Sequence, residues 1–139
     1  MANAGERAAF IDPLDMSYAA GLIDGEGTIG ITELEPGGNR KDGRRSRKSV
    51  QHRIYVAVTM TDEGPIAWLR ATFGGHFQAL PARNPKHRPT FRWSLSSVQA
   101  AEFCEIMEPF LRLKKQQAHL AASFFRERLS GNFQGNSGV

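Results

Sequence analysis

The spacing of apolar residues divides the first half of the chain into one helical and two strand-like segments. Asp12 and Pro13 are typical of a helix start, and apolar residues then recur three and four apart, which predicts a helix to about Asp24. From Thr28 the period changes to two, which predicts a strand that ends at Pro36-Gly37-Gly38. A second strand is predicted from Gln51. Its predicted inward residues are Ile54, Val56, Val58 and Met60, and its outward residues are Arg53, Tyr55, Ala57 and Thr59.

The second half of the chain repeats this order. Thr61 or Asp62 is expected to cap a short helix that Gly74-Gly75 ends. Residues 76–80 and 90–95 have the pattern of short strands on either side of a basic, proline-rich loop. A third helix is predicted to begin with a capping box of Ser96 and Gln99 and to end or kink at Pro109. A last helix is predicted from about Lys114 to Leu129. The expected apolar faces of these two helices are Val98, Phe103, Ile106 and Phe110, and Leu120, Ala121, Phe124 and Phe125.

Strands joined in pairs by short loops favour an antiparallel or mixed sheet with helices on one face, which is an α+β fold. A chain of 139 residues with 40% hydrophobic and 23% charged residues is typical of one globular domain. We assign residues 1–129 to a single domain, with 1–11 as a loose arm and 130–139 as a disordered tail.

Composition and charge indicate which kind of partner the chain binds and in which compartment it functions. The formal net charge of +4 favours an acidic partner such as nucleic acid. The single cysteine, Cys104, excludes an internal disulfide and lies in an apolar helical pattern, so we expect a buried, inert thiol. The start of the chain lacks the apolar segment of a secretory signal, and no apolar run approaches the ~18 residues of a membrane span. We therefore expect a soluble, intracellular protein with no membrane partner, in a bacterial cytoplasm or an organelle.

The stretch from Ala19 to Gly27 (AAGLIDGEG) places two glycines inside the last turns of the first helix. Each interior glycine costs a helix about 1 kcal/mol relative to alanine. Gly21 and Gly25 lie four residues apart, and with Ala20 and Asp24 they predict a narrow face that another backbone approaches closely. A simpler interpretation, glycine as a helix stop signal, explains Gly27 but not Gly21. The helix ends by placing the Glu26 carboxylate where it is suited to bind a metal.

These nine residues resemble the signature motif of the LAGLIDADG homing endonucleases, with Ala19 in place of the first leucine as the clearest departure. The chain has room for one copy, and single-copy members of that family act as homodimers whose motif helices lie side by side. The resemblance implies an αββαββα fold with a four-stranded saddle-shaped sheet in each subunit. It also implies a dimer interface at Ala20, Gly21 and Asp24, and a metal held by Glu26 and the Gly25 carbonyl.

Oxygen ligands without a cluster of cysteine or histidine favour Mg²⁺, with Mn²⁺ as a substitute and Ca²⁺ expected to support binding without cleavage. The segment from Pro109 to Ala118 resembles the family's entry to the last helix, which implies a catalytic lysine at Lys114, with Lys115 as the alternative. Many relatives carry a glutamine near Met60 that organises water at the active site. Met60 cannot take this role, so either Thr59 or Thr61 substitutes or the water network differs.

Polar and basic side chains are predicted to contact DNA in two ways. Outward residues of the sheet are suited to read base edges in a major groove, although any sheet with one solvated face alternates in the same way. Residues 40–48, which hold six of the 18 lysines and arginines, and the loop 83–88 are expected to contact phosphates. The predicted set is Thr28, Gly30, Thr32, Arg40, Lys41, Arg44, Arg45, Arg47, Lys48, Gln51, Arg53, Tyr55, Thr59, His76, Gln78, Arg83, Lys86, Arg88, Arg92 and Ser94.

The resemblance therefore implies a homodimeric, Mg²⁺-dependent endonuclease of double-stranded DNA. Such an enzyme hydrolyses both strands across the minor groove of a long, pseudo-palindromic site, and its expected role is intron homing. Two alternatives use the same fold: an intron RNA maturase and a non-catalytic DNA-binding regulator. The acid at Glu26 favours the nuclease over the regulator. A basic α+β interaction module unrelated to the family would be monomeric and would leave Gly21 unexplained.

Overall fold

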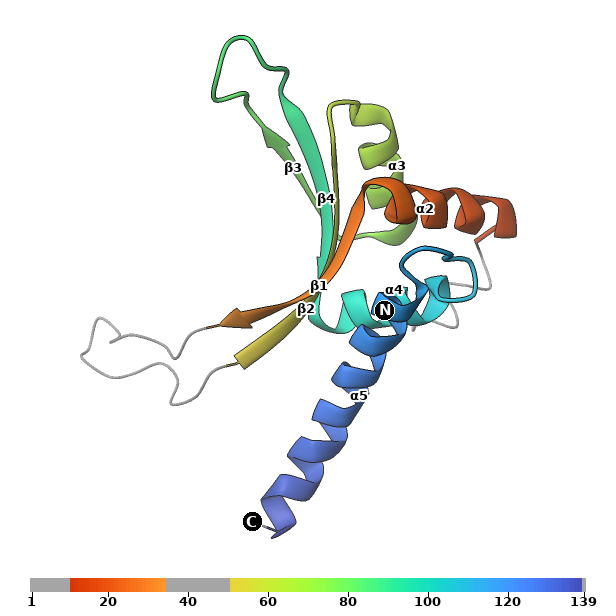
Figure 1. The fold of residues 1–139 in the computed structure, drawn as a ribbon, viewed down its shortest axis with the longest axis vertical. Helices are drawn as coiled ribbons and strands as arrows, with labels where there is room; N and C mark the ends of the chain where they lie inside the picture. The colour runs from red at the N-terminus through yellow and green to blue at the C-terminus, as the bar shows by residue number, and fades with distance from the viewer. Residues whose placement is uncertain (1–10, 35–50, 139) are drawn as a thin grey trace, which may run out of the picture.

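Helices and strands follow one another in the order that the sequence predicts (Figure 1). The computed structural model describes residues 11–34 and 51–138, and for residues 34, 51 and 129–138 it describes the backbone alone. The described elements are α2 (Pro13–Glu26), β1 (Gly27–Leu34), β2 (Gln51–Met60), α3 (Glu63–Phe73), β3 (His76–Leu80), β4 (Thr90–Ser96), α4 (Ser97–Met107) and α5 (Lys115–Gly138). The predicted α+β fold class is confirmed.

The four strands form one sheet in the order β1-β2-β4-β3, and every neighbouring pair is antiparallel. The sheet is therefore antiparallel rather than mixed. In β1 and β2 the register runs from Gly27 opposite Val58 to Leu34 opposite Gln51. The helices lie on one side of this sheet, which leaves its other face uncovered by the described chain (Figure 1).

The core lies between the sheet and the helices. Val56, Val58 and Trp93 face inward from the strands, as predicted, and they pack with fully buried residues of the helices. Phe103 lies at the centre of an aromatic cluster, with its ring centroid 5.0 Å from that of Phe73 and 5.4 Å from that of Trp93. The Trp93 indole N–H donates to the Gly74 carbonyl at 2.7 Å, which satisfies its one polar group within the core.

Capping residues mark the starts of two helices as the sequence predicts. The Asp12 carboxylate accepts from the Leu14 amide at 2.8 Å, and Asp62 rather than Thr61 caps α3 by accepting from the Gly64 amide at 3.0 Å. Gly74 ends α3 with a φ of 76°, a conformation that glycine adopts at little cost.

Several predictions for the last two helices are wrong. The Ser96 side chain makes no cap hydrogen bond, because the chain turns into α4 through Ser97 with a φ of 57°. Val98 and Leu120 are 51% and 56% exposed. The buried side of α4 carries Ala101 together with the predicted Phe103 and with Met107, and the buried residues of α5 include Ala118 and Ala121.

The last helix is longer than predicted. The backbone of α5 is helical to Gly138, through residues for which we expect a loose tail, and no proline there removes a backbone donor. The predictions for residues 1–10, for the strand end at 36–38, for the basic run 40–48 and for residue 139 lie outside the described residues. The single-domain assignment stays a prediction.

Two further predictions concern the single cysteine and the membrane-spanning segments. Cys104 is fully buried, and this burial raises the pKa of its thiol to about 12, which fits an inert thiol. No helix in the described part of the chain is both long enough and apolar enough to cross a membrane.

Candidate functional site

The carboxyl end of α2 carries the predicted catalytic acid. Met16, Ala19 and Ile23 pack into the core and fix the helix on the sheet, while Glu26, its last residue, is exposed. A Cβ added at Gly27 would lie 2.8 Å from the Ile23 Cα, so the turn from α2 into β1 requires glycine at this position. The side chain of Glu26 is thus presented to solvent at a junction that has a rigid, closely packed backbone.

The entry to α5 packs against this same end of α2. The Asp24 carboxylate accepts from the backbone N–H groups of Arg112 at 2.8 Å and Lys114 at 2.9 Å. The Lys114 ammonium donates to the Asp24 carbonyl at 2.7 Å. The structure therefore brings the predicted catalytic lysine next to Asp24, two residues before Glu26 in the chain.

Hydrogen bonding lowers the pKa of Asp24. Partial burial raises the pKa of this carboxyl, but the backbone N–H groups of Arg112, Lys114 and Leu113, together with the positive charge of Lys114, outweigh that effect. The pKa of Asp24 consequently lies below its ordinary value of 3.8. An ionised carboxylate at neutral pH is the form that accepts hydrogen bonds from these amides with both oxygens.

The residues of the predicted dimer face lie in different environments within one chain. Ala20 is 1% exposed and belongs to the core, because it lies on the side of α2 that faces the sheet. Asp24 is engaged by its own chain. Gly21 and Gly25 are exposed, and a Cβ added at either would meet no described atom within 4 Å beyond the backbone of its own helix. Nothing in the described chain therefore requires glycine at these two positions.

The uncovered face of the sheet brings predicted contact residues from different strands into rows. In one row Gln78, Arg92 and Thr59 lie opposite one another on β3, β4 and β2. A second row places His76 beside Ser94, with Thr28 further along on β1. Thr32 of β1 lies opposite Arg53 of β2. The register thus assembles donors and acceptors from all four strands on one surface.

Gly30 and Tyr55 are directly opposite each other on β1 and β2. A Cβ added at Gly30 would lie 2.8 Å from the Tyr55 hydroxyl oxygen and 2.9 Å from its ring carbons, so the ring lies across the glycine. The sequence interpretation treats these residues as separate contacts and misses this packing. The signal for it was present, because a glycine inside a strand often marks a close approach.

Basic residues of the β3–β4 loop extend this surface. Arg83, Lys86 and Arg88 are exposed, and the Asn84 side chain supports the loop by accepting from the Lys86 amide at 3.0 Å. The ion pairs among the described residues join His119 to Glu108 and Arg126 to Glu105, away from these cations. Some of the predicted DNA contacts lie outside the described part of the structure, namely Arg40, Lys41, Arg44, Arg45, Arg47 and Lys48 and the side chain of Gln51.

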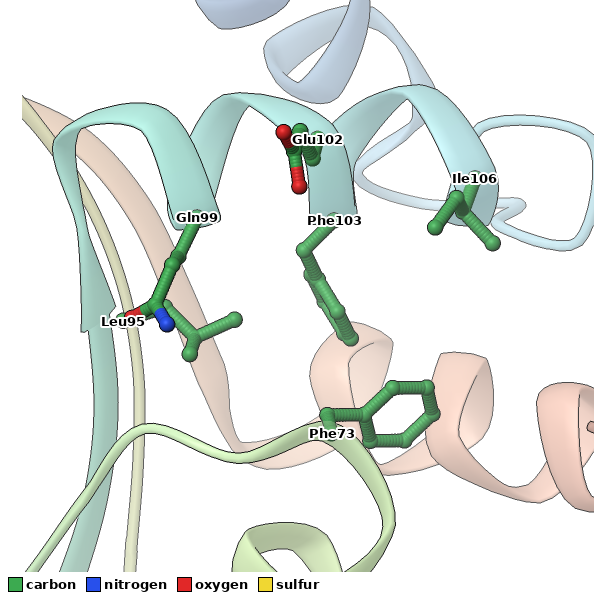
Figure 2. A pocket seen from close by; sticks show the side chains of 6 residues that line it. All are labelled: Phe73, Leu95, Gln99, Glu102, Phe103 and Ile106. Carbon is green, nitrogen blue, oxygen red and sulfur yellow. The ribbon is translucent and has the colours of Figure 1, made fainter. Parts of the chain in front are cut away.

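One pocket among the described residues belongs to the core rather than to the predicted site. Figure 2 shows a small pocket on the helix side of the sheet, where Phe103 of α4 points toward Phe73 and Gln99 and Glu102 lie at its edge. Its lining is mainly apolar, and its side chains belong to the packing around the aromatic cluster. Met60 is half-buried opposite Phe91. Among the described side chains, no three histidine, cysteine or acidic residues group so that they could hold a metal.

Solved structures similar to this one are homing endonucleases. The homing endonuclease I-CvuI in complex with a DNA target matches with a TM-score of 0.63 and 20% identity, over 81% of this chain and 66% of that one. The chain has the fold of the LAGLIDADG homing endonucleases. The archaeal intron-encoded I-Vdi141I, complexed with DNA, matches with a TM-score of 0.61 and 17% identity, over 85% and 70% of the two chains.

The intron-encoded I-CeuI, also complexed with DNA, matches with a TM-score of 0.59 and 13% identity, over 89% of this chain and 59% of that one. This chain therefore spans roughly two thirds of the length of these LAGLIDADG-fold structures. No protein-family model and no curated protein matches the chain. At these identities the likeness shows the LAGLIDADG fold alone.

Proposed function

We propose that this chain is a homodimeric, metal-dependent endonuclease that cuts double-stranded DNA at a specific site inside the cell. The observation that carries the proposal is the meeting of Lys114 with the carboxyl end of α2, which places a cation beside the helix end that presents Glu26. An acid and a lysine at one rigid junction are the groups that phosphodiester hydrolysis uses for charge stabilisation. The I-CvuI, I-Vdi141I and I-CeuI structures, all complexes with DNA, support the substrate class.

An apolar face on α2 that the described part of the chain leaves exposed supports the homodimer. Leu14 and Tyr18 are 78% and 49% exposed, and Gly21 and Gly25 continue the same face toward Glu26. A second copy of α2 laid against this face would bury the apolar side chains, and the glycines would allow close contact of the two backbones. The Glu26 carboxylates of the two protomers would then lie near the same axis.

The donor chemistry at this end of α2 fits a divalent metal. The Glu26 carboxylate and the Gly25 carbonyl are hard oxygen ligands, which suit Mg²⁺ or Mn²⁺ better than softer metals. Because the described residues of one chain hold no cluster of three ligands, the metal would draw further oxygens from the second protomer and from DNA phosphates. When bound, the ion would activate water and neutralise charge on the leaving oxygen. The Lys114 ammonium would stabilise negative charge on the phosphate.

The uncovered face of the sheet supplies the contacts with DNA in this proposal. Its rows of threonine, arginine, histidine, glutamine and tyrosine side chains carry the donors and acceptors that distinguish base edges in the major groove. The exposed cations Arg83, Lys86 and Arg88 would contact phosphates and set the salt dependence. The basic run at residues 40–48 is proposed to do the same.

A cleavage screen against a library of randomised duplexes tests this function. The protein with Mg²⁺ is expected to cut one family of related, nearly two-fold symmetric sites, and with Ca²⁺ to bind these sites without cutting. Glu26→Gln is expected to lower cleavage by at least about 100-fold and to retain binding. A wild-type protein that binds a site in Mg²⁺ but never nicks it contradicts the proposal, as does undiminished cutting by Glu26→Gln.

A further inference from the structure

Asp24 binds its own chain with two different groups. Its two carboxylate oxygens accept from two separate backbone amides, Oδ2 from Arg112 at 2.8 Å and Oδ1 from Lys114 at 2.9 Å. Its backbone carbonyl accepts from the Lys114 ammonium at 2.7 Å. Lys114 is therefore held at both ends, by its amide and by its Nζ atom, on a single residue that lies 90 positions earlier in the chain.

The position of this contact on α2 explains why a cation is stable there. The last carbonyl groups of a helix lack partners within the helix and lie at the negative end of its dipole. The last turn of α2 contains no basic residue of its own. Lys114 supplies the missing cation from a distant segment, and it does so at the carbonyl that lies two residues before Glu26.

We propose that Asp24 is a positioning residue that fixes the turn at Arg112–Lys114 and thereby places the Lys114 ammonium at the end of α2. This inference rests on the proposed nuclease function, in which the ammonium acts on the phosphate. A lysine side chain is long and flexible, so an unheld Nζ atom would sample many positions. A misplacement of about 1 Å at a reacting centre can cost about 100-fold in rate.

Asp24 acts through Lys114 in this proposal and not on the substrate. Both of its oxygens are already engaged by amides of the chain, which separates it from Glu26, whose carboxylate is exposed.

The test compares Asp24→Ala and Asp24→Asn with the wild-type chain. Asparagine retains the shape of aspartate but has one acceptor oxygen, so one of the two amides would face its NH₂ group. Asp62→Ala is the matched control, because Asp62 also accepts from a backbone amide, that of Gly64 at 3.0 Å, but at the start of α3. The rate of acetylation by an amine-acylating reagent reports on Lys114, with exposed Lys115 as the reference within each protein.

In the wild-type protein Lys114 is expected to react more slowly than Lys115. Asp24→Ala is expected to abolish this protection, Asp24→Asn to reduce it, and Asp62→Ala to leave it unchanged. In single-turnover assays, Asp24→Ala is expected to lower the Mg²⁺-dependent cleavage rate by about 100-fold while its affinity for the same site in Ca²⁺ changes by less than about twofold.

Equal reactivity of Lys114 and Lys115 in the wild-type protein overturns the proposal without any variant. Protection that survives in a folded Asp24→Ala protein, or that is undiminished in a folded Asp24→Asn protein, also overturns it, as does a loss of DNA affinity that matches the loss of rate. If the wild-type protein cuts no DNA, the proposed nuclease function fails, and the acetylation rates still decide whether Asp24 positions Lys114.

Discussion

The two sides of α2 are both apolar, yet they have opposite environments. On the inner side Met16, Ala20 and Ile23 are buried against the sheet. On the outer side Leu14 is largely exposed and Tyr18 is half-exposed. A helix that is apolar all round is normally covered all round. The described part of the chain therefore covers only one side of this helix, and the other side is the face that we propose for the second protomer.

The largest expected effect comes from adding bulk to the outer side. Gly21→Leu places a side chain where the described chain offers open space, so folding is expected to continue, but two α2 helices can no longer approach closely. We expect a monomer in sedimentation equilibrium at concentrations where the wild type is dimeric, and no detectable cleavage. Ala71→Leu, on an exposed site of α3, is the control and is expected to remain dimeric. A dimeric Gly21→Leu protein would place the interface elsewhere.

Removing bulk from the inner side is expected to act on folding instead. Ile23 is fully buried, so Ile23→Ala is expected to lower the free energy of unfolding by about 2–5 kcal/mol. Leu14→Ala, on the outer side, is expected to change the unfolding of the isolated monomer by less than about 0.5 kcal/mol. Urea denaturation of dilute protein measures both values. Similar losses for the two variants would remove the contrast between the sides.

Tyr18 lies at the border between the two sides, since its ring packs edge-on against Trp68 with centroids 5.0 Å apart. Tyr18→Ala is expected to cost the monomer about 0.5–1.5 kcal/mol and also to weaken the dimer. Tyr18→Phe retains the ring and is expected to preserve both. Thermal unfolding and the dissociation constant of the dimer separate the two contributions, and an unchanged dissociation constant for Tyr18→Ala would exclude Tyr18 from the interface.

The smallest expected effect is on how the free energy of unfolding depends on pH. Because the folded state lowers the pKa of Asp24 below 3.8, its contribution to stability is fully present above that pH and is lost as the pH falls through the lowered value. Asp24→Asn is therefore expected to be less stable than wild type near neutral pH, with the difference shrinking below pH 3.8. Urea titrations across this range measure the difference, and a gap that stays constant would argue against an ionised Asp24.

Local signals allowed most of the fold to be predicted. Helix ends could be predicted at Asp12-Pro13 and at Gly74-Gly75, because capping depends only on residues that are close in the sequence. Alternation in β2 and β4 correctly identified Val56, Val58 and Trp93 as inward. The signals failed for Val98 and Leu120, because an apolar residue in a helix does not reveal which of two sides the rest of the fold covers.

Long-range contacts explain the gaps in the predicted site. The motif predicts Glu26 and the segment 109–118 predicts Lys114, but only the folded chain shows that Asp24 joins the end of α2 to the segment before α5, 90 positions later. Ala20 looked like an interface residue because small residues favour close approach, and the sequence does not say whether the approaching backbone belongs to the same chain. Here the sheet of the same chain covers Ala20.

The packing of Tyr55 across Gly30 has a practical consequence for mutagenesis of the sheet surface. The two positions behave as one unit, since any larger residue in place of Gly30 must first displace the Tyr55 ring on β2. A library that varies Gly30 alone would mainly sample displaced rings. Randomising both codons together is the way to explore new chemistry at this point of the surface.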